Sequence, residues 1–434
     1  MVRDYCIVGL GSRGLRMFAK DLLANYRDVA RLTGICDINP GRLSYAGKEL
    51  GADIPPFVDF AGMLGAVSCD TVIVATKDAA HHEYIIAALE AGKDVITEKP
   101  MTIDGPKCRA ILDAEERTGR RVTVTFNYRY APYKTAVKQL LRDGVVGDIH
   151  SVEFRWFLDT VHGADYFRRW HRHKQDSGGL FVHKASHHFD LVNWWLDLEP
   201  QDVFAMGGRH FYTADRMTGR GERCSDCMAR SDCPFYFDIS HGRMKALYAD
   251  NEHHDGYHRD QCVFSGSTDI EDTMSALVRY ERGVQLTYAL TAYAPFEGWK
   301  VAFNGSKGRL EAFEPEYFVS VENQTAFQQR QSPELRRPVD WTSGDALAGR
   351  DVESLQIKFY PVFGGAQTWA VPVQTGGHGG GDRLLKDHLF RPDAPDRYGH
   401  RAGSRAGALA VLVGAAANVS MDEGRLVHIS EFMP

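Results

Sequence analysis

The sequence predicts an α/β fold of two domains, and three observations lead to that prediction. The chain has 434 residues, which is too long for one ordinary small domain and suits two. Hydrophobic residues make up 44% of it and charged residues 25%, a composition typical of a soluble globular protein. Strand-like and helical segments alternate over the first 125 residues, which indicates βαβ units and a parallel sheet.

Within these 125 residues, short apolar runs are separated by segments with helical spacing of their apolar positions. Gly92 and Gly119 each follow such a segment, at the position where glycine commonly ends a helix. The pattern predicts strands at 6–8, 32–36, 71–75, 95–96 and 122–124, and helices at 15–25, 79–91 and 104–119. We therefore expect the first domain to span 1–125 and the second to span 126–434.

A glycine-rich turn directly follows the first predicted strand and opens the first predicted helix. Gly9 permits the tight turn, Gly11 lets the backbone approach a pyrophosphate, and Gly14 lets the helix pack closely on the strand. Asp37 ends the second strand, where a carboxylate accepts hydrogen bonds from a ribose 2′-hydroxyl and repels a 2′-phosphate. This favours NAD over NADP, although the nearby Arg42 weakens the exclusion.

Charge and hydropathy exclude several classes of function. The net charge is −6, so a nucleic-acid-binding surface is not expected. No run approaches about 18 uninterrupted apolar residues, so we expect no transmembrane helix. The first residues lead straight into a strand-like run, which argues against a secretory leader. We expect a cytoplasmic protein.

Several runs resemble the glucose–fructose oxidoreductase/inositol dehydrogenase family, known as Gfo/Idh/MocA. The clearest is the run from Asp94 to Pro100, and the resemblance continues at 127–132, 144–149, 178–190 and 303–308. It implies a Rossmann domain followed by an α/β domain with a large, mostly antiparallel sheet. The open face of that sheet often mediates oligomerisation, so a homodimer or homotetramer is expected. The implied chemistry is hydride transfer between a nicotinamide and a sugar or polyol hydroxyl.

Glu98, Lys99 and Pro100 stand at the carboxyl end of a predicted strand, where open α/β sheets bind ligands. Pro100 restricts Lys99 to an extended conformation, which aims the lysine side chain. In the resembled family this X–Pro bond is often cis. The predicted cofactor-binding residues are Gly9, Gly11, Ser12, Arg13, Gly14, Asp37, Arg42, Thr76, His81, Glu98, Lys99 and Asn127.

Residues 183–196 have the spacing of one helix, with His183, His187 and Asp190 on a single face. Two histidines beside a carboxylate suit either a metal site or an acid/base site. The resemblance maps His187 to the usual catalytic histidine and Asp190 to the second acidic residue, whereas His183 replaces the family's first aspartate. We predict His187 as the base, Lys99 as its electrostatic partner, and His183 as a third catalytic residue.

A cationic segment precedes this helix, with four Arg or Lys and two His between positions 168 and 174. It indicates an anionic substrate held by arginine, or else a solvated loop or interface salt bridges. A glycine loop at 376–382 is either a lid or a connector. The predicted substrate-binding residues are Arg168, Arg169, Trp170, Arg172, Lys184, Asp190 and His378.

Four cysteines cluster in a polar, turn-rich stretch within an expected insertion at about 209–262. Cys224, Cys227 and Cys233 are separated by two and five residues, and Cys262 follows after a further 28. This spacing is compatible with a structural zinc bound by four thiolates, with disulfides, or with free thiols. A last helix is expected at about 404–420.

The leading functional prediction is an NAD-dependent carbohydrate oxidoreductase, with an anionic sugar as substrate. The alternative is a redox-neutral, NAD-dependent glycosidase that oxidises the sugar transiently, eliminates the aglycone and adds water. An acidic glycoside such as a sulfosugar would suit the cationic segment, and net turnover of NAD separates the two functions. A non-catalytic nucleotide sensor is a third interpretation, which Lys99 and His187 argue against.

Overall fold

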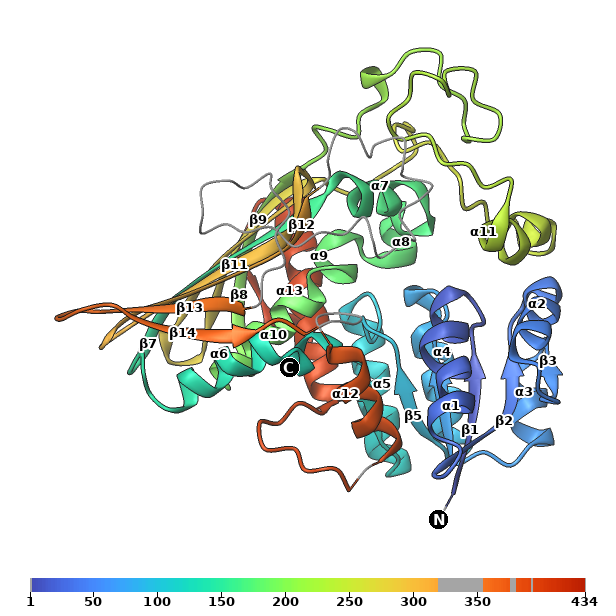
Figure 1. Ribbon diagram of the computed structural model, residues 1–434, viewed down its shortest axis with the longest axis horizontal. Coiled ribbons are helices and arrows are strands. Elements are labelled where there is room, and N and C mark those ends of the chain that lie inside the picture. Colours follow the sequence, from blue (N-terminus) through green and yellow to red (C-terminus); the bar gives the residue numbers. More distant parts are fainter. Residues whose placement is uncertain (1, 319–353, 375–379, 392, 434) are drawn as a thin grey trace.

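The computed structural model describes residues 2–318, 354–374, 380–391 and 393–433, which form two sheets flanked by helices (Figure 1). The seven-stranded sheet has the order β15-β6-β5-β4-β1-β2-β3. Its six parallel strands are β1 (Arg3–Val8), β2 (Ala30–Cys36), β3 (Pro56–Phe57), β4 (Thr71–Val74), β5 (Asp94–Thr97) and β6 (Val122–Val124). This is the strand order of a dinucleotide-binding fold, and the predicted Rossmann domain is confirmed.

The helices of this domain alternate with the strands, as predicted at 15–25, 79–91 and 104–119, and two more lie at 40–50 and 60–66, where no helix was predicted. They are η1 (Gly14–Ala19) with α1 (Lys20–Asn25), α2 (Pro40–Leu50), α3 (Phe60–Ala66), η2 (Asp78–Ala80) with α4 (His81–Glu90), and α5 (Gly105–Thr118). Asp104 caps the start of α5 by accepting a hydrogen bond from the Lys107 amide, and Gly119 ends the helix in the left-handed conformation.

The glycine-rich turn after β1 depends on the absence of side chains. Gly9 has φ of +92°, and a Cβ atom there would lie 2.5 Å from the carbonyl oxygen of Ala75 on the neighbouring strand connection. A Cβ on Gly14 would lie 1.9 Å from the Gly9 carbonyl oxygen. The helix can therefore begin directly on the strand, which leaves its N-terminus open at the carboxyl edge of the sheet.

The nine-stranded sheet has the order β14-β13-β12-β11-β7-β10-β9-β8-β16. Among the described strands, β7 and β10 pair in parallel and every other neighbouring pair is antiparallel, which confirms the mostly antiparallel sheet. The strands are β7 (Ile149–Asp159), β8 (Pro200–Gly208), β9 (Thr273–Tyr280), β10 (Gln285–Ala294), β11 (Phe296–Gly305), β12 (Gly308–Phe318), β13 (Ser354–Pro361), β14 (Gln367–Pro372) and β16 (Val427–His428).

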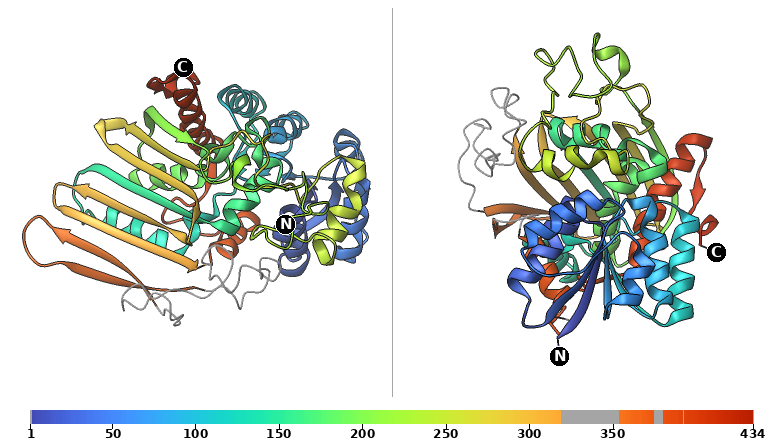
Figure 2. Two further views of the ribbon diagram at one scale, coloured as in Figure 1. Left: turned by 90° about the horizontal axis from the view of Figure 1, so that it is seen from above. Right: turned by 90° about the vertical axis from the view of Figure 1, so that its right-hand side faces the viewer.

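One face of this sheet is covered by helices and the other is open (Figure 2). Alternate residues of β9, such as Met274, Ala276 and Val278, are buried, whereas Leu277 between them is 57% exposed. The helices of this domain are α6 (Pro132–Arg142), α7 (Thr160–Arg168), α8 (Lys174–Ser177), α9 (Gly179–His183), α10 (Ser186–Leu196), α11 (Gly242–Leu247), α12 (Gly381–Phe390) and α13 (Ser404–Glu423).

The C-terminal segment links the two sheets. β15 (Ala402–Gly403) pairs antiparallel with β6, and α13 continues from it. Among the described residues, α13 alone has the length and mean hydropathy of a membrane-spanning helix. However, 72% of its most apolar window is buried inside the protein, as in a core helix. A Cβ on Gly414 would lie 2.3 Å from the Phe181 carbonyl oxygen, so α13 packs directly against α9.

The insertion at about 209–262 packs against the first domain. Its α11 and η6 (Ala249–His254) lie over the start of α2 (Figure 1). The Asn39 side chain, which caps α2, donates a hydrogen bond to the Asn251 carbonyl oxygen at 2.8 Å. A Cβ on Gly41 would lie 2.0 Å from Asn251 Oδ1, so the two segments are in close contact.

Candidate active site

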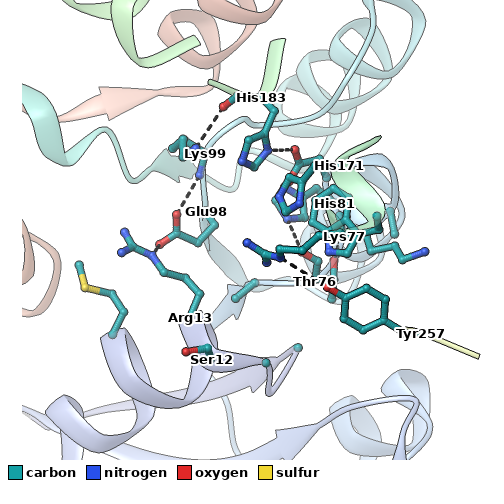
Figure 3. Close-up of a pocket in the computed structure, with 18 of the residues that line it drawn as sticks. Ser12, Arg13, Thr76, Lys77, His81, Glu98, Lys99, His171, His183 and Tyr257 are labelled. Atoms are coloured by element: carbon teal, nitrogen blue, oxygen red, sulfur yellow. Dashed lines mark hydrogen bonds and ion pairs between the residues drawn. The ribbon is translucent and has the colours of Figure 1, made fainter. Parts of the chain in front are cut away.

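A cavity of about 840 Å³ opens at the carboxyl edge of the parallel sheet, between the two domains and the insertion. Open α/β sheets bind their ligands at this edge. The first domain contributes the glycine-rich turn and the ends of β2, β4 and β5, the second contributes α7 and α9, and the insertion contributes the segment from Met244 to Arg259. Figure 3 shows several of these side chains converging from separate elements.

Most of the predicted cofactor-binding residues line this cavity, namely Gly9, Gly11, Ser12, Arg13, Asp37, Arg42, Thr76, His81, Glu98 and Lys99. Gly14 and Asn127 do not. Gly14 serves the close packing of the first helix. Asn127 is buried and donates a hydrogen bond from Nδ2 to Asp382 Oδ1 at 2.6 Å, which orients a carboxylate that does line the cavity.

Asp37 is held where the second strand ends. Its Oδ2 accepts a hydrogen bond from the Leu10 amide at 2.7 Å, and its Oδ1 accepts one from the Asn39 amide at 2.9 Å.

The Ser12 amide, in the glycine-rich turn, donates to the Tyr248 hydroxyl of the insertion at 2.9 Å. Backbone amides at a helix start commonly bind phosphate, so the Tyr248 hydroxyl lies beside the expected pyrophosphate position.

Lys99 enters the cavity from the end of β5. Its Nζ donates to the carbonyl oxygen of His183 at 3.1 Å (Figure 3). The Lys99–Pro100 bond is cis, as the resemblance implies. Burial lowers the pKa of Lys99 to about 8; Asp78 opposes this shift and Lys184 adds to it. Glu98 beside it accepts a hydrogen bond from Arg13 Nε at 2.6 Å.

The expectation of one continuous helix from 183 to 196 is wrong. α9 ends at His183 and α10 begins at Ser186, because the amides of Lys184 and Ala185 both bond to the Leu180 carbonyl oxygen. His183 and His187 therefore lie on different helices, yet both line the cavity. The break turns the His183 carbonyl oxygen toward Lys99.

Asp78, which sequence reasoning missed, is hydrogen-bonded to Nδ1 of His183. Burial raises the pKa of Asp78 well above its usual value, and burial with the nearby Lys99 and Arg169 charges lowers the pKa of His183 well below its own. Both shifts favour a neutral pair. The replacement of the family's first aspartate by His183 therefore does not leave Lys99 without a carboxyl neighbour, because Asp78 supplies one.

His187 also lines the cavity, with its ring stacked on Tyr128 at a centroid separation of 4.1 Å. Lys184 Nζ donates to the Tyr128 hydroxyl at 3.1 Å and lies 4.2 Å from the centroid of the Trp156 ring. Lys184 is buried and lines the cavity. These aromatic contacts fix the orientation of His187 and place a cation beside it.

His171 is a further cavity residue that the sequence did not single out. Its ring stacks on Trp170 at 3.7 Å and meets the edge of the His183 ring at 4.2 Å between centroids. Burial lowers the pKa of His171 well below its usual value, and its buried Nδ1 atom has no hydrogen-bond partner among the residues that the structure describes. Such an atom is available to a bound substrate.

The cationic segment is divided between the cavity and the interior. Arg169 and Trp170 line the cavity, whereas Arg168 and Arg172 do not. Arg168 is buried and donates to Cys224 Sγ at 3.1 Å and to the Phe235 carbonyl oxygen at 2.7 Å. Arg172 is buried and donates to side chains of residues 261–268. The substrate-binding prediction for these two arginines is corrected, because their guanidinium groups anchor the insertion.

Asp190 also binds inside the protein rather than in the cavity. It forms a bidentate ion pair with Arg129, with Arg129 Nε 2.7 Å from Asp190 Oδ2, and both side chains are buried. Asp190 does not line the cavity, so its predicted contact with substrate is corrected to a structural ion pair. His378 lies outside the described residues.

Cys224, Cys227, Cys233 and Cys262 gather round a second, small cavity beside Arg168. All four are free thiols, so the disulfide alternative is not supported. Within the described part of the chain, no group of three or more His, Cys, Asp or Glu is arranged to hold a metal ion. The zinc prediction is therefore unsupported.

Comparison with known proteins shows similarity over nearly the whole chain. Residues 3–126 match the family described as "Oxidoreductase family, NAD-binding Rossmann fold", and residues 138–429 match its "C-terminal alpha/beta domain". The chain is 36% identical to the Bacillus subtilis protein named "Putative oxidoreductase YteT", over 99% of this chain and 98% of that one.

More distant similarities agree with this. The chain is 29% identical to the inositol 2-dehydrogenase/D-chiro-inositol 3-dehydrogenase of Lactiplantibacillus plantarum, over 38% of this chain and 45% of that one. Its fold is similar to that of the WlbA dehydrogenase from Bordetella pertussis, solved with NADH and UDP-GlcNAcA. The TM-score is 0.62 at 18% identity, over 99% of both chains.

Proposed function

The chain belongs to the Gfo/Idh/MocA oxidoreductase family, and on that premise we propose that it transfers a hydride between NAD and a hydroxyl group of a sugar. The observation that carries the proposal is one cavity that joins the glycine-rich turn to Lys99, His183 and His187. A polyol is the substrate named for the inositol dehydrogenase relative, which supports a carbohydrate here.

The residues of the first domain fit a dinucleotide. Gly9 and Gly11 leave the turn without side chains, and Asp37 is positioned to accept hydrogen bonds from a ribose. NAD, when bound, supplies the hydride acceptor. The protein's own contribution is to hold the sugar, to remove the hydroxyl proton and to stabilise the alkoxide as the hydride leaves.

His187 is assigned as the group that accepts the hydroxyl proton, because it lines the cavity and is oriented by Tyr128. Lys99 is assigned as the cation that stabilises the developing alkoxide. The Asp78–His183 pair borders Lys99 and keeps a carboxyl group near its charge. His171, whose Nδ1 has no partner within the described part of the chain, is assigned to a substrate hydroxyl.

This assignment predicts an alkaline fall in the rate of sugar oxidation. Lys99, whose pKa is lowered to about 8, is protonated below that pH and loses its proton as the pH rises through it. The initial rate should therefore fall above pH 8 in a stopped-flow pH profile. Lys99→Arg retains the charge and should move the fall to higher pH. A rate that instead rises through pH 8 would assign Lys99 as the base.

The charges of the cavity favour an anionic sugar. Its lining contains nine Lys or Arg side chains and five Asp or Glu side chains, in a protein of net charge −6. Arg169 and Arg259 share a single carboxylate, that of Asp165, so this corner of the cavity retains positive charge. An acidic group on the sugar would be bound there by charge-assisted hydrogen bonds.

Arg169→Ala should therefore weaken an acidic sugar more than its neutral analogue, by about 1.5–3 kcal/mol in kcat/KM. Arg169→Lys serves as the control that keeps the charge but loses the planar fork. The measurement compares both variants and wild type on the same pair of sugars. Equal losses on the two sugars would show that Arg169 only supports the insertion.

A redox-neutral glycosidase is the second candidate, and the insertion favours it. Tyr248 on the Ser12 amide and Asp255 on Arg42 place the insertion over the nucleotide edge, which suits a cofactor that stays bound. Such an enzyme would release sugar and aglycone with NAD in substoichiometric amount. An oxidoreductase would instead accumulate one reduced nicotinamide for each sugar oxidised.

We further propose a cytoplasmic homo-oligomer, either a dimer or a tetramer. All eight cysteines are free, as is usual in a reducing compartment. The open face of the nine-stranded sheet carries a cavity of about 690 Å³ lined by both charged and apolar side chains, such as Arg155 and Phe313. Zinc is not part of the proposal.

A further inference from the structure

We infer that Asp255, a residue of the insertion, makes the nucleotide site selective for NAD against NADP by occupying the guanidinium group of Arg42. The inference rests on the proposed use of NAD. It concerns an arginine that lies beside Asp37 in the place where NADP-binding sites commonly use an arginine to hold the 2′-phosphate.

Arg42 donates hydrogen bonds to two carboxylates. Its Nε and Nη2 lie 3.1 Å and 3.0 Å from Asp37 Oδ1, and Nη2 also lies 2.5 Å from Asp255 Oδ2. Arg42 is only 9% exposed, and the side chain of Asp255 is 10% exposed. One buried guanidinium thus lies between two carboxylates, so the cluster carries a net negative charge.

That charge discriminates between the two nucleotides. A ribose 2′-hydroxyl is neutral and can donate a hydrogen bond to Asp37, so NAD is accepted. A 2′-phosphate would meet two carboxylates and an arginine whose Nε and Nη2 atoms already donate to them. Without the Asp255 charge, the cluster would be neutral and the Nη2 donor of Arg42 that Asp255 now binds could turn to the phosphate.

The insertion holds Asp255 firmly in this position. The Tyr257 amide donates to Asp255 Oδ1 at 3.2 Å. On the other side, Asn251 accepts a hydrogen bond from Asn39 through its carbonyl oxygen, and Tyr248 bonds to the Ser12 amide. The carboxylate is therefore fixed by contacts on both sides of residue 255, so the arrangement belongs to the docked insertion.

The test is a titration of the full-length protein with NAD and with NADP by calorimetry. Asp255→Asn removes the charge and keeps the shape, and it should raise the NADP/NAD affinity ratio by about tenfold or more, since one charge near a doubly charged phosphate is removed. If the asparagine side chain of Asp255→Asn disturbs folding, Asp255→Ser gives a second measurement of the NADP/NAD affinity ratio. Asp250→Asn, on an exposed residue of the same insertion paired with Lys245, is the matched control and should leave the ratio unchanged.

A double variant makes the inference specific to Arg42. In the Asp255→Asn background, Arg42→Ala should cancel the gain in NADP affinity, because the freed guanidinium is gone. An unchanged ratio in both Asp255 variants, or a gain that persists without Arg42, would overturn the inference while leaving the NAD proposal intact. Failure of wild type to bind NAD at all would overturn both.

Discussion

His187→Ala and Lys99→Ala should each lower the turnover of the sugar substrate by about 10²–10⁴, the usual cost of losing a general base or its partner. NAD affinity should remain close to that of wild type, because neither side chain is assigned to the pyrophosphate or the adenosine ribose. Steady-state kinetics gives the first quantity and calorimetry the second. The combination separates loss of chemistry from loss of the cofactor site.

A histidine of the first domain provides the control. His82 follows His81 in α4, bonds to the Ala79 carbonyl oxygen and does not line the cavity, so His82→Ala should keep wild-type turnover. Full activity in His187→Ala would contradict the assignment. The proton acceptor would then be sought at His171 or His183, which border the same cavity.

Asp190→Ala should lower the free energy of unfolding by about 3–5 kcal/mol, because it leaves the buried Arg129 without its bidentate partner. Denaturant unfolding measures this loss. Glu153→Ala removes a partner of Arg309 in an exposed ion pair and should cost only about 0–1 kcal/mol. If Asp190→Ala leaves the free energy of unfolding unchanged and raises KM, Asp190 contacts the substrate after all.

The fold could be predicted from the sequence because its signals are local. Most strands and helices of the first domain follow from apolar periodicity and from glycines such as Gly119, whereas α2, β3 and α3 were not predicted. Gly9 and Gly14 could be placed because a strand followed at once by a helix requires them. The second sheet was expected only from the resemblance, since long-range strand pairing has no comparable local signature.

Residues of the site could be predicted only where they belong to a sequence motif. Lys99 and His187 belong to such motifs, whereas Asp78 meets His183 across 105 positions of sequence. One signal could have found Asp78, because it follows the end of β4, at the edge where ligands bind. Asp255 and Tyr248 had no signal, since their partners are set by how the insertion docks.

The charge pattern did not predict which arginines line the cavity, and helical spacing did not predict the break between α9 and α10. The run of charges from Arg168 to Lys174 does not indicate which guanidinium groups face the interior of the protein. In the structure, Arg168 and Arg172 are buried and donate hydrogen bonds to the insertion. The break between α9 and α10 occurs without glycine or proline at Lys184 and Ala185. Tertiary contacts, which bury both residues, override the helical spacing there.

The proposed reaction is the transfer of a hydride from a sugar hydroxyl to NAD within one cavity, with the help of Lys99. Single-turnover mixing of the enzyme–NAD complex with acidic and neutral sugars, followed by nicotinamide fluorescence, tests it most directly. We predict reduced nicotinamide with an acidic sugar, a primary isotope effect when the carbinol hydrogen is deuterium, and loss of the signal in Lys99→Ala. Bound NAD that no sugar reduces, or a signal that persists unchanged in Lys99→Ala, would contradict the account.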